Sequence, residues 1–329
     1  MSDHKAQRVN LPLLATKDDC TGRTYIVTGA NTGLGFEAAK HLVALGSNKV
    51  ILAVRNVTAG NEAKAKIDSA TNTTDVAEVW YLDLANYDSV KNFAKKAIAE
   101  LDRIDGLIQN ASVASIAEEP LNGQDANISI NVVGTFLLAL HLLPRLSESA
   151  RKNNTQSRLT FVSSRAGFDV EKPWSMIKDD PFVGIRTTKE VGPAKYPLSK
   201  LIETWAVREL ASLAPVSKTD VIINIVCPGI CVTDLDRSAP PEFRKHLAEL
   251  RAKVGRTAED GSRTLIHGVA AGDDTHGLLL HSCEIGEADV PEWVTNEEGQ
   301  LAQKKVWEAV TGELERIDPG CVGKLEVLA

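Results

Sequence analysis

Tyr196 and Lys200 are the two residues whose types and spacing most directly suggest chemistry. They lie four positions apart in the segment Y-P-L-S-K, so on a helix they would share one face. A tyrosine is a poor acid or base at neutral pH because its ordinary pKa is about 10. A nearby positive charge lowers that pKa, so the pair could exchange a proton near neutral pH. The same spacing also occurs by chance on ordinary helices, and other features must decide.

A glycine-rich stretch near the N-terminus could bind the phosphates of a cofactor. It reads T-G-A-N-T-G-L-G at residues 28–35, between a predicted strand at 24–28 and a predicted helix at about 35–45. Glycine permits a tight turn and a close approach of the backbone to a ligand. A helix N-terminus offers unpaired N–H groups and a positive dipole end to a pyrophosphate. The residues expected to bind the cofactor here are Gly29, Asn31, Thr32, Gly33, Leu34 and Gly35.

Apolar, β-rich stretches alternate with helical ones along the chain. Strands are predicted at residues 24–28, 49–54, 78–83, 106–109, 158–163, 221–227 and 277–283, with helices at about 35–45, 58–70, 89–101, 122–146 and 198–213. Such alternation predicts a doubly wound α/β fold, a parallel sheet with helices on both faces. We expect an N-terminal arm at 1–22 and one Rossmann-like domain at 23–329. Two segments, about 165–195 and 234–275, read as irregular loops that frame a substrate pocket.

Composition narrows the class of protein. Of the 329 residues, 43% are hydrophobic and 25% charged, as in ordinary globular proteins, and the net charge of −7 argues against a nucleic-acid partner. The five cysteines, without a C-x-x-C motif, and the spacing of His276 and His281 predict neither a disulfide framework nor a metal site. The first ten residues lack the apolar core of a signal peptide, and no membrane span is apparent. We therefore expect a cytoplasmic enzyme.

The end of the second predicted strand indicates which cofactor is bound. An acidic residue at that position binds the 2′-hydroxyl of NAD, whereas an arginine accommodates the 2′-phosphate of NADP. Here the strand runs into Arg55 and Asn56, with no acid. The guanidinium fork also suits a phosphate. The sequence therefore predicts NADP(H), although an arginine on an exposed turn is the alternative.

With these pieces in place, the chain resembles the short-chain dehydrogenase/reductase family from about residue 21 to residue 233, and more faintly to the C-terminus. The further motifs that carry the resemblance are D-L at Asp83 and Leu84, N-A-S at Asn110, Ala111 and Ser112, I-N-V-V-G with Asn131, S-S at Ser163 and Ser164, and P-G-I-C-V-T from Pro228 to Thr233. Within the family, the long segment between Ser164 and Tyr196 and the strand-like G-L-L-L-H-S-C at residues 277–283 resemble the retinol-dehydrogenase-like members and the fungal natural-product reductases. The chain departs from the family at Ser112, where a glycine is usual.

The resemblance implies a set of site residues. The catalytic set is Ser164, Tyr196, Lys200 and Asn131, with Ser163 as the alternative serine. The cofactor set adds Asp83, Leu84, Asn110, Ala111, Tyr196, Lys200, Pro228, Gly229, Ile230 and Thr233. In this scheme the tyrosine donates a proton, the serine binds the growing negative charge, the lysine lowers the pKa of the tyrosine and holds the ribose, and the asparagine holds a water.

The function expected from these residues is NADP(H)-dependent reduction of a ketone or aldehyde of a mid-sized organic metabolite, of the secondary-metabolite type. The partner is then a small carbonyl or alcohol substrate, and similar proteins suggest a homodimer. Two alternatives stay open: an NADP(H)-binding protein without redox work, such as a sensor or cyclase-like catalyst, and a structural subunit. The aromatic residues of the 165–195 segment, Phe168, Trp174 and Phe182, could line the pocket or pack in the core.

Overall fold

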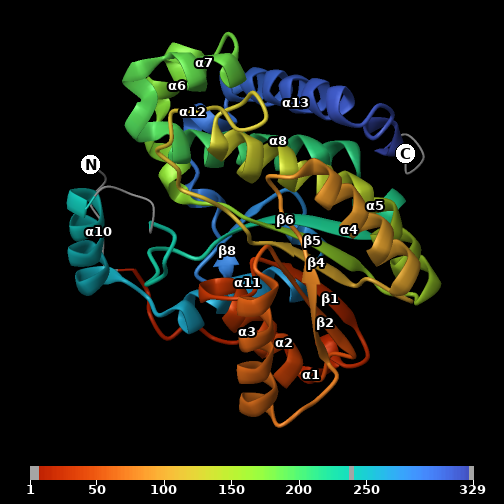
Figure 1. Ribbon diagram of the computed structural model, residues 1–329. Helices are drawn as coiled ribbons and strands as arrows, with labels where there is room; N and C mark the ends of the chain where they lie inside the picture. Colours follow the sequence, from red (N-terminus) through yellow and green to blue (C-terminus); the bar gives the residue numbers. More distant parts are fainter. Residues whose placement is uncertain (1–6, 237–240, 326–329) are drawn as a thin grey trace.

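One sheet forms the centre of the protein, and the computed structural model describes residues 7–236 and 241–325. In that part of the chain, eight strands lie in the order β3-β2-β1-β4-β5-β6-β7-β8 (Figure 1). Neighbouring strands are parallel except β7 and β8. The strands are β1 (Thr24–Thr28), β2 (Lys49–Val54), β3 (Ala77–Tyr81), β4 (Gly106–Gln109), β5 (Ser157–Val162), β6 (Val221–Cys227), β7 (Leu279–His281) and β8 (Glu284–Ile285). The predicted fold class, a doubly wound α/β domain, is confirmed.

Helices cover both faces of the sheet. In Figure 1, α4, α5 and α8 lie on one face and α2, α3 and α11 on the other, while α13 packs outside α8 and α10 stands apart at one side. The longer helices are α2 (Gly33–Ala44), α3 (Val57–Thr71), α4 (Tyr87–Glu100), α5 (Thr135–Lys152), α8 (Lys195–Leu213), α10 (Pro241–Val254), α11 (Ala258–Ala270) and α13 (Glu297–Ile317). The short ones are α1 (Lys17–Cys20), α6 (Glu171–Ile177), α7 (Pro181–Thr187), α9 (Val216–Thr219) and α12 (Glu292–Thr295), with single turns η2 (Arg165–Asp169), η3 (Lys189–Ala194), η4 (Asp273–Thr275), η5 (Glu287–Asp289) and η6 (Val322–Leu325).

The central strands are apolar because both of their faces are covered. Every residue of β1 and of β6 is buried, as expected for parallel strands between two helical layers. Side chains alternate between the layers: Ile26 packs into one hydrophobic cluster, and Tyr25 and Val27 into the other. The order in which the strands are added to the sheet reverses between β1 and β4, although the two strands are parallel. Ligands bind outside the carboxyl ends of the strands at such a point.

The long apolar helix predicted at residues 122–146 has two parts. A π-helical turn, η1 (Ile128–Gly134), runs directly into α5. By length and hydropathy the combined helix, Ile128–Lys152, could cross a membrane, but 78% of its most apolar window is buried inside the protein. Its place in the core accounts for its hydropathy.

The expectation of irregular loops at about 165–195 and 234–275 is wrong. The first segment folds into η2, α6, α7 and η3, and the second contains α10 and α11. Pro181 stands at the start of α7, where its missing N–H is harmless. Gly184 lies within α7 and Pro193 within η3, so these residues do not prevent short helices. Residues 237–240 lie outside the described part of the chain.

The N-terminal arm lies on the domain from residue 7 onward. Leu11 is fully buried, and its backbone N–H donates to a carboxylate oxygen of Asp260 at 2.6 Å. The Asn10 N–H donates to the other oxygen of that carboxylate at 3.0 Å. Asp260 lies in the first turn of α11, so the arm is fixed to a helix about 250 positions later in the chain.

Candidate active site and cofactor site

Tyr196 and Lys200 lie on the first turns of α8, which begins at Lys195. The helix therefore places them on one face, as their spacing predicted. Ser164 ends the loop after β5 and caps η2 by accepting from the Ala166 N–H at 3.2 Å. The Ser164 hydroxyl lies close enough to the Tyr196 hydroxyl to lower the pKa of the tyrosine. The loop after β5 and the start of α8 thus bring the serine and the tyrosine together.

The neighbouring Ser163 faces the other way. Its hydroxyl donates to the Lys200 carbonyl at 3.2 Å and lies 3.1 Å from the Thr204 hydroxyl. The side chain is 4% exposed and belongs to the packing between β5 and α8. The geometry favours Ser164 over Ser163 as the serine that could meet a substrate.

The pKa of Tyr196 moves in the direction opposite to the one expected. Burial raises the pKa of Tyr196, and the negative charge of Glu203 raises it further, while the Ser164 hydrogen bond offsets part of the rise. Burial is the main reason, and Lys200 does not offset it, since its Nζ is paired with a carboxylate, 3.0 Å from Glu203 Oε2. The tyrosine is therefore protonated at neutral pH, in the form that donates a proton.

Asn131 lies in the π-helical turn η1 and is fully buried. Its side chain pairs with the backbone of Val113, accepting from the N–H and donating to the carbonyl, both at 2.9 Å. It also donates to the Ser199 hydroxyl at 3.0 Å, which in turn donates to the Tyr196 carbonyl at 2.7 Å. Asn131 thus supports the first turn of α8 through Ser199, and no direct bond to Lys200 is among the described contacts.

The glycine turn forms a cradle at the start of α2. Gly29 and Gly33 have positive φ angles of +67° and +59°, which side chains rarely adopt. A Cβ on Gly35 would lie 2.5 Å from Asn110 Nδ2 and 2.7 Å from the Gly29 carbonyl oxygen. Asn110 itself is held by Thr28, whose carbonyl accepts from Nδ2 at 2.9 Å. The turn after β4 therefore packs directly against the glycine turn, as the motif order predicted.

The remaining expected cofactor residues of the first half lie at the same edge of the sheet. Arg55 is exposed directly after β2, and Asn56 caps α3 by accepting from the Ala59 N–H at 3.0 Å. Asp83 follows β3, the neighbour of β2, and its carboxylate accepts from the Ala85 N–H at 3.0 Å. Leu84 is buried, and its carbonyl lies where a Cβ on Gly134 would stand. Of the other turn residues, Asn31, Thr32, Leu34 and Ala111 lie in the glycine turn or against it.

The segment from Pro228 to Thr233 follows β6 and is held from behind by two side chains. Arg256, 1% exposed, donates to the Pro228 carbonyl at 2.8 Å and to the Arg8 carbonyl of the arm at 2.6 Å. The Gln7 carboxamide accepts from the Ile230 N–H at 3.0 Å and donates to the Ile230 carbonyl at 2.6 Å. The segment is therefore fixed by the arm and by residues next to α11.

Two further positions connect this segment to the glycine turn. Gly229 has a φ of +80° and lies against Gln7 and Arg256, so it has no room for a side chain. Thr233 reaches the glycine turn, since a Cβ on Gly33 would lie 3.5 Å from its methyl group. The two halves of the expected cofactor site are thus adjacent.

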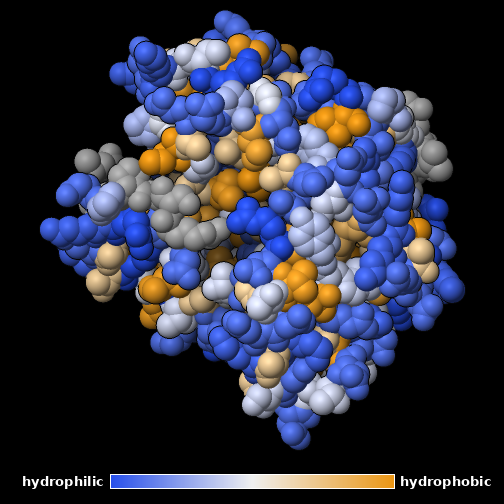
Figure 2. Space-filling view, in the orientation of Figure 1, coloured by the Kyte–Doolittle hydropathy of each residue, from blue (hydrophilic) through white to orange (hydrophobic). Residues whose placement is uncertain are grey.

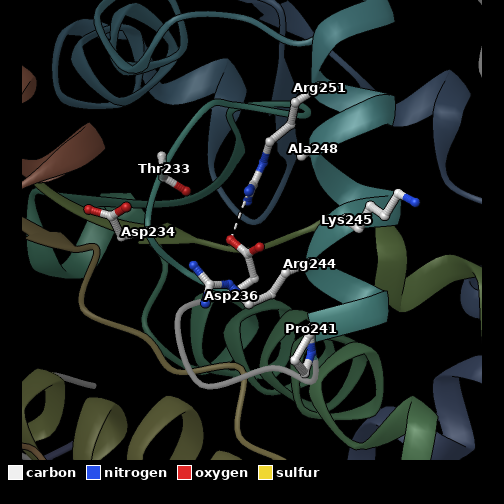
Figure 3. Close-up of a pocket in the computed structure, with 8 residues that line it drawn as sticks. All are labelled: Thr233, Asp234, Asp236, Pro241, Arg244, Lys245, Ala248 and Arg251. Carbon is white, nitrogen blue, oxygen red and sulfur yellow. Dashed lines mark hydrogen bonds and ion pairs between the residues drawn. The ribbon is translucent and has the colours of Figure 1, made fainter.

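A cavity of about 400 Å³ opens between Thr233 and α10 (Figure 3). Arg251 points across it from α10 to Asp236, with 2.7 Å between Nη1 and Oδ1. Arg244 and Lys245 also line it, with Lys245 turned away from the ion pair. Tyr196 and Lys200 are not among its lining residues, so this cavity adjoins the cofactor segment and not the catalytic pair. Figure 2 shows hydrophobic residues gathered at the centre of the same face, between α6 and α7 above and α11 below.

These features fit a nicotinamide dinucleotide. The cradle of glycines leaves backbone open to a ligand, and the first turn of α2 contains no acidic residue that would repel a pyrophosphate. Ser112, after β4, has a buried hydroxyl without a hydrogen-bond partner among the described residues. The departure from the usual glycine therefore adds a buried polar atom to the turn after β4.

Comparison with known proteins identifies the family. A family model described as short chain dehydrogenase matches residues 23–176. The short chain dehydrogenase/reductase dmxR8 of Cryptosporiopsis sp. is 38% identical over 305 residues, which cover 91% of this chain and 93% of that protein. The short chain dehydrogenase FGM9 of Gibberella zeae is 35% identical, with 94% and 90% covered. The chain belongs to the short-chain dehydrogenase/reductase family.

Solved structures agree on the fold of this dehydrogenase/reductase. A short-chain type dehydrogenase/reductase from Mycobacterium marinum aligns with a TM-score of 0.64 at 19% identity, covering 85% of this chain and 100% of the other. A short chain dehydrogenase from Escherichia coli CFT073, complexed with NADPH, aligns with a TM-score of 0.60 at 22% identity, covering 82% and 99%. As a family member, the protein is an oxidoreductase that binds a nicotinamide cofactor and acts on a small molecule.

Several residues of this short-chain dehydrogenase/reductase were missed by sequence reasoning. Glu203 is the buried partner of Lys200, and Asp125 forms a buried ion pair at 3.0 Å with Lys195, the residue before the catalytic tyrosine. Asn127 holds the backbone of Ser115 just as Asn131 holds that of Val113. The N-x-x-x-N spacing on one helix face was a usable signal for Asn127. The pair of Lys200 and Glu203 also had one, since the two residues are three positions apart on a predicted helix. The pair of Lys195 and Asp125 had none, because these residues meet only in the folded chain.

Proposed function

We propose that the protein is an NADP(H)-dependent reductase of a ketone or aldehyde in a mid-sized organic metabolite. The observation that carries the proposal is the placing of Tyr196 at the start of α8 beside Ser164: burial raises the pKa of the tyrosine, so its hydroxyl keeps the proton, and the Ser164 hydroxyl lies next to it. When a hydride adds to a carbonyl carbon, negative charge grows on the carbonyl oxygen. A protonated phenol can donate a proton to that oxygen, and a second hydroxyl beside it can donate a hydrogen bond.

The residues divide the work as follows. The bound nicotinamide supplies the hydride. Tyr196 Oη donates its proton to the carbonyl oxygen as negative charge grows there, and Ser164 Oγ donates a hydrogen bond to the same oxygen. Lys200 is held under the start of α8 by the Val162 carbonyl and the Glu203 carboxylate. Asn131 donates to Ser199, which donates to the Tyr196 carbonyl, so Asn131 holds the first turn of α8 in place.

NADP(H) is proposed over NAD(H) because of the end of β2. Arg55 stands there with Asn56, and no carboxylate that would bind a ribose 2′-hydroxyl follows β2. Support also comes from the E. coli structure, a protein of the same fold complexed with NADPH. A metabolite of intermediate size is supported by the hydrophobic residues gathered at the centre of the face in Figure 2 and by the neighbouring cavity.

A panel of aldehydes, small ketones and bulky ketones, followed by NADPH absorbance, tests the proposal. We expect oxidation of NADPH with at least one bulky carbonyl, at a rate that exceeds that with NADH. Y196F should lower kcat by about 100-fold or more while the dissociation constant for NADPH stays within twofold. Binding of NADPH without turnover of any carbonyl or alcohol would favour a non-redox protein. Failure to bind either nucleotide would reject the proposal.

A further inference from the structure

Glu203 is a buried carboxylate that does not belong to the expected catalytic set. It lies on α8, one turn after Lys200 and two turns after Tyr196, and it is 1% exposed. Carboxylates are rarely buried in this way unless they are paired. Its location beside the catalytic pair therefore calls for a role.

The carboxylate is paired with the catalytic lysine. Lys200 Nζ lies 3.0 Å from Glu203 Oε2 and 3.3 Å from Oε1, and it donates to the Val162 carbonyl at 2.9 Å. An ammonium carries three donors, and these three acceptors lie on the buried side of the lysine. The ammonium and the carboxylate together form a nearly neutral unit between α8 and the end of β5.

Few other ionisable groups act on this unit. Burial raises the pKa of Glu203, while the Lys200 ammonium and the Ser163 hydroxyl on the β5 side lower it. Tyr196, from the same helix, and Cys227, at the end of β6, complete the cluster of titratable groups. Among the described residues no other charge contributes to the pKa of Glu203, so Lys200 and Glu203 determine the local field.

We propose that Glu203 is a positioning residue of the reaction: its carboxylate balances the Lys200 ammonium, so that Tyr196 meets a neutral pair and stays a proton donor. The inference rests on the proposed function and extends it by one residue. Without Glu203, the lysine would present an unbalanced cation to the tyrosine. A cation alone favours the phenolate, which is the form that accepts a proton in alcohol oxidation.

The size of the effect follows from the helix. Seven residues of α-helix span about 10 Å, which approximates the separation of Tyr196 and Glu203 along α8. A unit charge at about 10 Å, acting through an effective dielectric constant of about 20, changes a pKa by about one unit. Because the carboxylate is negative, it raises the pKa of Tyr196, and its removal lowers that pKa.

Two measurements on E203Q test the inference. In carbonyl reduction with NADPH, kcat declines above the pKa of the proton donor, and this alkaline decline should begin about one pH unit lower in E203Q than in the parent. Independently of turnover, the protein can be made with difluorotyrosine, whose fluorines lower the phenol pKa into an accessible range. The ¹⁹F NMR titration of the signal that is missing in Y196F should move down by the same amount.

The controls separate charge from structure. E203D retains the carboxylate and should keep both midpoints within about 0.3 pH unit of the parent, a small fraction of the full shift. E209Q makes the same change on the same helix, where Glu209 accepts from Gln303 at 2.7 Å, and should leave both midpoints unchanged. If circular dichroism shows E203Q to be unfolded, K200M and K200M/E203Q give the same comparison by ¹⁹F NMR, with the lower midpoint in the double variant.

The outcomes are decisive. An unchanged or raised midpoint for Tyr196 on removal of the carboxylate overturns the inference. So does an equal shift in E209Q, because the effect would then belong to the helix as a whole. If the parent reduces no carbonyl, the proposed function fails, while the ¹⁹F titration still measures the effect of Glu203 on Tyr196.

Discussion

Replacing Trp174 by alanine tests whether the segment between Ser164 and Tyr196 serves the core or the substrate. Trp174 lies on α6, is 6% exposed and meets Trp205 of α8 edge to face, with 4.7 Å between ring centroids. Phe168 and Phe182 of the same segment are also buried in the main hydrophobic cluster. The structure therefore favours packing, and we expect W174A to weaken the fold.

The magnitude follows from the burial. Truncation of a buried tryptophan to alanine costs about 3–5 kcal/mol. Unfolding entropy is about 2.1 cal/mol/K per residue near 60 °C, or about 0.7 kcal/mol/K for a chain of 329 residues. A loss of about 4 kcal/mol then lowers Tm by about 6 °C.

Thermal unfolding and steady-state kinetics together decide the matter. M176A is the matched control, because Met176 lies on the same helix but is 45% exposed, and it should shift Tm by less than about 1 °C. The KM for bulky and small carbonyls should change in parallel in W174A, since the ring contacts the core. A raised KM for bulky substrates alone, with Tm unchanged, would refute the packing argument and place Trp174 in the pocket.

Three further outcomes are expected. R55D should reduce the preference for NADPH over NADH by about tenfold, a modest change because Arg55 is exposed and its charge is screened; an unchanged ratio of kcat/KM values would show that it does not bind the 2′-phosphate. In G35A the added Cβ would lie 2.5 Å from the Asn110 side chain, so we expect a loss of about 1–3 kcal/mol of unfolding free energy and weaker binding of NADPH. G312A, with open space around its Cβ, should change neither quantity. Urea unfolding measures the stability, and isothermal titration measures the binding. Burial lowers the pKa of His276, so the unfolded chain binds its proton first, and the unfolding free energy should fall as pH drops from about 7 to 5; in H276Q that slope should be smaller, and an identical slope would exclude the histidine.

Sequence reasoning was accurate where local pattern determines structure. β1, β2, β4 and β6 were predicted to the residue, because buried parallel strands are short apolar runs bounded by polar residues. Tyr196 and Lys200 lie on one helix, α8, as their spacing predicted, although the ammonium of Lys200 bonds to Glu203 and Val162. These features depend on neighbours within a few positions.

Features that depend on distant partners were not predictable. The prolines and glycines of residues 165–195 suggested loops, yet tertiary packing of Trp174 against Trp205 supports helices there. The pKa of Tyr196 was expected to fall beside Lys200, but that argument omitted Glu203, whose burial only the fold reveals. α13 went unpredicted although Val306, Val310 and Leu314, all buried, repeat at helical spacing.

The contacts of the N-terminal arm also determine which parts of the protein can fold first during synthesis. Gln7 bonds to Ile230 and Val254, partners that lie 223 and 247 positions later in the chain. At a synthesis rate of about 5–20 residues per second, the arm waits for about 10–45 seconds before the first of them exists. Strands β1, β2 and β4 can pair during that interval, whereas the segment after β6 and the arm must settle together at the end. The part of the expected cofactor site between Pro228 and Thr233 is thus completed only after Val254 has been made.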